Sequence, residues 1–108
     1  MDFNQFFQQL KDGAVQIAQQ EATQYVEDVK KGGLDFLDTS KDYLDKWTKQ
    51  LAAGTIDKED FEFLVKGLTW DVAEMEALKN AGMSAVRIER IQDALIDLIL
   101  KAAFSAIP

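Results

Sequence analysis

The sequence lacks cysteine and histidine altogether, and its single proline, Pro108, is the last residue. Without those two side chains the chain cannot form a disulfide, a thiolate nucleophile, an imidazole base or the zinc sites that they build. Its six glycines form neither of the glycine-rich patterns that bind nucleotide phosphates. These absences exclude large classes of enzymes and metalloproteins.

The sequence also lacks a long apolar run and a basic segment. Its most apolar stretch, residues 94–107, includes Asp97 and Lys101 and is shorter than the roughly 20 apolar residues that cross a membrane. The chain opens with Met1-Asp2 and not with the basic region of a signal peptide, so a cytoplasmic protein is expected and a membrane partner is disfavoured. The 19 acids outnumber the 12 bases, and no segment between glycines is net basic, so we expect no binding of nucleic acid.

The first half of the sequence has a helical pattern. No proline interrupts it, and two mostly apolar series at steps of 11 residues keep one stripe along a straight helix. This spacing predicts a long helix over about 3–52. Each glycine of Gly32-Gly33 costs about 1 kcal/mol relative to alanine, so the helix is expected either to continue through this pair, straight or bent, or to break there. The series are Phe3, Ala14, Tyr25, Phe36 and Trp47, and Phe7, Ala18, Val29, Ser40 and Leu51.

The second half predicts two further helices, over about 58–81 and 85–107, joined by a short turn. Asp57 is placed as the N-cap of the first helix. Gly82 is placed to end that helix in a Schellman turn, and Ser84 to cap the next one. So short a connection makes the two helices an antiparallel hairpin. We therefore predict an all-α fold, a single domain in which the long N-terminal helix packs on this hairpin as an antiparallel helical bundle.

Carboxylates are the only abundant reactive groups, and their positions do not form a site. Asp38 and Asp42 match the start of a calcium-binding loop, but Tyr43 stands where that loop needs glycine and Lys49 where it needs glutamate. The acids clustered over 57–62 surround a helix start, where acids ordinarily cap the helix. We therefore expect a non-enzymatic protein with no catalytic residue, no cofactor and no metal.

Apolar side chains exceed those that the predicted helices can bury alone. A continuous helix over 3–52 would be about 75 Å long, twice the length of the hairpin, and would expose an aromatic stripe near its start unless a second chain covered it. In the helix over 58–81, Phe63 and Trp70 lie opposite the main stripe and face either a partner or the core. The predicted interface residues are Phe3, Phe6, Phe7, Leu10, Ala14, Ile17, Phe63, Trp70, Leu100, Phe104 and Ile107.

These features lead to the hypothesis of a helical interaction protein that self-associates as a homo-oligomer, as an adaptor or an assembly subunit, or that binds another protein. If the N-terminal segment reverses near Gly32-Gly33, a four-helix bundle would instead bury the aromatic stripe within one chain. Two alternatives remain. One is peripheral lipid binding through the amphipathic N-terminal helix, although this helix lacks a basic face. The other is a small acidic inhibitor or immunity-type protein with a basic partner, which the net charge of -7 permits.

Overall fold

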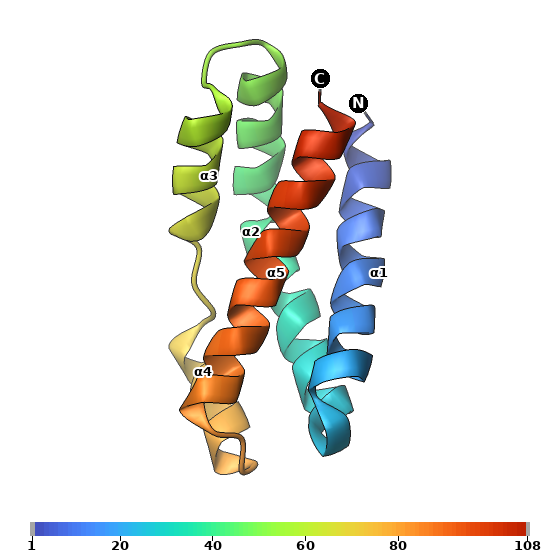
Figure 1. The fold of residues 1–108 in the computed structure, drawn as a ribbon, viewed down its shortest axis with the longest axis vertical. Coiled ribbons are helices and arrows are strands. Elements are labelled where there is room, and N and C mark those ends of the chain that lie inside the picture. Colours follow the sequence, from blue (N-terminus) through green and yellow to red (C-terminus); the bar gives the residue numbers. More distant parts are fainter. Residues whose placement is uncertain (1, 108) are drawn as a thin grey trace.

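The computed structural model describes residues 2–107, apart from the side chain of Thr23. Within these residues the chain forms an all-α antiparallel bundle, as predicted (Figure 1). Helix α1 packs on α2 and α5, α3 packs on α5 and α2, and the short α4 packs on α2 and α5. The elements are α1 (Phe3–Glu21), the 3-10 helix η1 (Thr23–Tyr25), α2 (Val26–Ala52), α3 (Lys58–Lys66), α4 (Val72–Asn80) and α5 (Ala85–Ala106).

The helix ends that depend on local side chains lie where the sequence places them. The Asp57 carboxylate accepts a hydrogen bond from the backbone N–H of Asp60 at 2.8 Å, which caps α3. The Ser84 hydroxyl caps α5. Gly82 has a φ of +112°, and the N–H of Met83 donates to the carbonyl of Leu78 at 3.1 Å. This bond is the mark of a Schellman turn, so all three predictions are confirmed.

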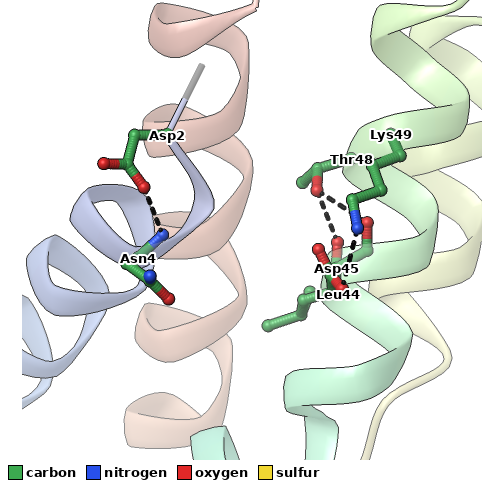
Figure 2. Close-up of polar contacts among 6 residues, drawn as sticks. All are labelled: Asp2, Asn4, Leu44, Asp45, Thr48 and Lys49. Carbon is green, nitrogen blue, oxygen red and sulfur yellow. Dashed lines mark hydrogen bonds and ion pairs between the residues drawn. The ribbon is translucent and has the colours of Figure 1, made fainter.

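Two further polar arrangements satisfy the backbone or a buried side chain locally (Figure 2). The Asp2 carboxylate accepts from the backbone N–H of Asn4 at 2.9 Å and caps α1. The Thr48 side chain is fully buried, and its hydroxyl donates to the carbonyls of Leu44 at 2.7 Å and Asp45 at 3.1 Å. Because its own helix supplies the acceptors, the buried Thr48 hydroxyl is hydrogen-bonded without a partner from another helix.

The predicted long helix over 3–52 is wrong in one respect, because the chain reverses at Ala22–Tyr25, before Gly32-Gly33. A side chain from the far end of the sequence holds this reversal. The Arg87 guanidinium donates to the carbonyl of Glu21 at 2.9 Å and lies 6.0 Å from the ring centroid of Tyr25. A cation at a helix C-terminus satisfies a carbonyl that the helix leaves unpaired. The reversal thus depends on tertiary contacts that residues 20–26 do not reveal.

Gly32 and Gly33 lie inside α2, where both are buried against neighbouring helices. A Cβ at Gly33 would lie 3.7 Å from the Cβ of Ala14 on α1 and 3.7 Å from Leu95 on α5. A Cβ at Gly32 would lie 2.9 Å from a carboxylate oxygen of Glu74 on α4. Gly32 therefore lets the Glu74 side chain of α4 approach α2, whereas at Gly33 there is room for a methyl group beside α1 and α5. Neither glycine ends the helix.

The predicted helix over 58–81 is also divided, because α3 ends at Gly67 and α4 begins after Asp71. In the connecting segment Trp70 turns into the core, where it is 2% exposed. Its indole N–H donates to the carbonyl of Gly32 at 2.9 Å, and its backbone N–H donates to the side-chain oxygen of Gln92 at 3.3 Å. These two contacts fix the indole between α2 and α5.

The early reversal shortens the molecule and buries the N-terminal stripe. The fold measures 43 × 22 × 18 Å, so the helix of about 75 Å does not exist. In the bundle α3 and α4 follow one another along one side and together take the place of a single helix beside α1, α2 and α5 (Figure 1). The stripe of α1 lies against α2 and α5, with Phe6, Phe7, Leu10, Ala14 and Ala18 buried. Across residues 2–107 no helix is long and apolar enough to cross a membrane.

Candidate functional site

An apolar groove lies between α2 and α3. It has a volume of about 430 Å³. Phe63 is 78% exposed and Tyr43 57% exposed beside it. The Tyr43 ring stacks on that of Trp47, with 5.4 Å between the centroids. We call this the α2–α3 surface, formed by Tyr43, Trp47, Phe63, Leu64, Lys66, Gly67 and Leu68.

The amphipathic structure of α3 explains why Phe63 is exposed. Phe61 and Val65, two residues before and after it, are completely buried. The Phe61 ring packs 5.8 Å from that of Phe104 on α5. Since residues two apart point to nearly opposite sides of a helix, burying Phe61 and Val65 leaves Phe63 facing solvent. The core of α3 is complete without Phe63, which is therefore available for contact with another molecule.

Charged residues extend the α2–α3 surface in an ordered way. Glu59 precedes Phe63 by one turn, Glu62 directly precedes it, and Lys66 follows it by one turn. The ammonium of Lys66 lies 2.9 Å from the Glu62 carboxylate. The exposed face of α3 is thus acidic at its start, aromatic at its centre and basic at its end.

The structure separates the predicted interface residues into three groups. Seven of them are buried within the chain: Phe6, Phe7, Leu10, Ala14, Trp70, Leu100 and Ile107. Three are partly buried and pack against the core: Phe3, Ile17 and Phe104. Only Phe63 is strongly exposed. Most of these residues are covered because α1 folds back on α2, and Trp70 because the helix breaks before it.

Sequence reasoning missed Tyr43 and Trp47 as members of a surface. Trp47 belongs to the apolar series of the N-terminal half, which assigned it to the buried stripe. In the structure it is only partly buried. The spacing of the two aromatic residues could have indicated a shared surface, since positions four apart lie on one face of a helix.

A second groove brings together carboxylates that are distant in the sequence. It has a volume of about 320 Å³, lies between α2 and the start of α4, and contains Asp35, Asp71 and Glu74. Burial and the hydrogen bond between its side chain and Asp35 raise the pKa of Glu74 from 4.5 to about 7. The negative charges of Asp35 and Asp71 raise this pKa further, whereas Lys31 lowers it.

The carboxylates of this second groove do not form a metal-binding site. Within residues 2–107 no three or more acidic side chains converge so that they could hold a metal ion.

Comparison with known proteins found no family model, no curated protein and no solved structure that matches the chain. The physical features of the two grooves are therefore the basis for inferring function.

Proposed function

We propose that this protein is a non-enzymatic helical interaction protein that self-associates through the α2–α3 surface. The observation that carries the proposal is the exposure of Phe63 and Tyr43 beside an apolar groove, in a chain whose core is already filled without them. Exposed aromatic side chains that line a groove are typical of contact sites, because covering them removes apolar area from water. A role as an assembly subunit or adaptor follows from such a contact.

The charges on α3 favour a second copy of this chain as the partner. If two α3 helices pair antiparallel about Phe63, the acidic start of each helix meets the basic end of the other. Glu59 of one copy then lies close to Lys66 of the other, which also contacts Glu62 of its own chain. A two-fold contact must be complementary to itself, and this order of charges meets that requirement.

The fold does not favour lipid binding through the N-terminal helix. The apolar stripe of α1 lies in the core, where Phe6, Phe7 and Leu10 are at most 4% exposed. A lipid surface would have to displace α2 and α5 to reach these side chains. The α2–α3 surface is reached without unfolding, so we place the contact there.

Sedimentation equilibrium of matched variants tests the proposal. Phe63→Ser removes the exposed aromatic ring, whereas Val86→Ser removes an apolar side chain that is 67% exposed on α5. Losing a central aromatic anchor weakens association by about 2 kcal/mol, or roughly thirtyfold in the dissociation constant. We expect that loss for Phe63→Ser and none for Val86→Ser.

Circular dichroism of both variants shows whether the helices are retained. A wild-type chain that sediments as a monomer throughout the micromolar range would overturn self-association. Equal weakening by the two substitutions would show that the α2–α3 surface is not the contact.

A further inference from the structure

The segment that connects α3 to α5 is held to α2 at a small number of points. Leu78 is the single buried residue of α4, and Trp70, just before α4, is buried between α2 and α5. Between these two anchors, Glu74 places its carboxylate against the backbone of Gly32 on α2. Because the helical part is only nine residues long, it depends on these contacts and has little stability of its own.

One of these contacts is a pair of carboxyl groups. The side chains of Glu74 and Asp35 line the same cavity, and the Glu74 carboxylate lies against Gly32, one turn before Asp35 on α2. A hydrogen bond between two carboxyl groups requires a proton on one of them. When both groups are ionised, the bond is lost and two negative charges face each other in a partly buried place.

The other groups around Glu74 do not cancel this repulsion. Asp71, at the N-terminus of α4, adds a negative charge, and Lys31 on α2 opposes it. Asp28 on α2 lines the neighbouring cavity of about 280 Å³ together with Glu74 and Lys31. From α5, the side chain that reaches this segment is the uncharged Gln92. Three acids and one lysine therefore surround the Glu74 carboxyl group.

We propose that Asp35 and Glu74 form a proton-dependent latch, which holds residues 69–80 against α2 while the two carboxyl groups share a proton and releases them when both are ionised. The segment released includes α4 and the turn that carries Trp70. A cavity of about 320 Å³ is lined by both carboxyl groups and a second of about 280 Å³ by Glu74, so water can enter as the segment loosens. The latch is a property of one chain and does not rest on self-association.

The direction of the pH dependence follows from the raised pKa of Glu74. The folded protein holds this proton up to about pH 7, whereas a released segment has the ordinary value of 4.5. The latch therefore contributes its full stability below about pH 4.5 and loses it as the pH rises through about 7. The attachment of α4 is predicted to be tighter in mild acid than in mild alkali.

Hydrogen–deuterium exchange of the wild-type chain measures this attachment directly. The protection of α4 amides is compared with that of α1 amides at about pH 5 and about pH 8, after correction for intrinsic exchange. We expect the relative protection of α4 to fall about tenfold between the two values, since each unit of pKa shift corresponds to a factor of ten and solvent screens part of it. Equal relative protection at both pH values overturns the latch.

Variants identify the groups responsible. Glu74→Gln and Asp35→Asn each leave one amide that donates to the remaining carboxylate without titrating. Both are expected to abolish the pH dependence. Glu76→Gln is the matched control, because Glu76 is an exposed acid of α4, and it is expected to retain the tenfold fall. If Glu74→Gln loosens α4 at both pH values, Asp35→Asn decides, and persistence of the fall in that variant contradicts the proposal.

Discussion

Gly32 and Gly33 are adjacent in the sequence, yet they have different neighbours, and only Gly32 lies where an added Cβ would not fit. At Gly33 an added Cβ would make ordinary van der Waals contacts of 3.7 Å with Ala14 and Leu95. At Gly32 it would collide with the Glu74 carboxylate at 2.9 Å. Sequence reasoning treated the pair as one weak point in a helix. Their distinct neighbours become visible only when α1, α4 and α5 are in place.

This difference predicts opposite results for two alanine substitutions. Gly33→Ala is expected to stabilise the fold by about 0.5–1 kcal/mol, because alanine favours the helix and fits the available space. Gly32→Ala is expected to gain nothing or to lose stability, because its methyl group displaces Glu74. Urea denaturation of the two variants measures the difference. If Gly33→Ala destabilises the protein as much as Gly32→Ala does, the packing described for α2 is incorrect.

At the scale of the elements, local chemistry was predictable and long-range contacts were not. The caps Asp57 and Ser84 and the turn at Gly82 act on backbone groups within a few residues, so the sequence alone places them. The reversal after α1 depends on Arg87, whose hydrogen bond to Glu21 spans 66 positions. The inward turn of Trp70 depends on the carbonyl of Gly32, 38 positions away. Neither the Arg87–Glu21 contact nor the Trp70–Gly32 contact can be predicted from the spacing of apolar residues in the sequence.

The role of Arg87 in the α1–α2 reversal is open to a direct test. Arg87→Gln removes the charged donor to the Glu21 carbonyl and the cation over the Tyr25 ring. It is expected to destabilise the fold by about 1 kcal/mol and to speed amide exchange at residues 22–26. Arg90→Gln removes the same charge one turn away and is the control. Equal effects of the two substitutions on stability and on exchange would refute the role assigned to Arg87.

At the scale of the whole molecule, the reversal decides which apolar residues remain for a partner. Folding α1 back onto α2 and α5 covers the stripe that the sequence suggested as an interface. Phe63, for which the sequence left both a partner and the core open, is exposed because Phe61 and Val65 on the same short helix fill the core. The surface around Phe63 includes Tyr43 and Trp47, which come from α2 and meet α3 only after folding. One member of the candidate site was therefore predictable, and its surroundings were not.

The two proposals concern different faces of this bundle and can fail separately. The latch acts where α4 meets α2 near Gly32, whereas the contact surface lies where α3 meets α2 near Tyr43. Loss of the latch in Glu74→Gln leaves Phe63 in place. Loss of the contact in Phe63→Ser leaves the carboxyl pair in place.

Cross-linking between isotopically distinct copies tests the central claim of self-association through the α2–α3 surface most directly. Unlabelled and ¹⁵N-labelled chains are mixed and treated with a carbodiimide, which joins a lysine to a carboxylate with no spacer. The antiparallel pairing of α3 predicts mixed-isotope cross-links between Lys66 of one copy and Glu59 of the other, and predicts their loss in Phe63→Ser. Cross-links at these positions that form only within one copy, or mixed-isotope cross-links confined to other faces, would contradict it.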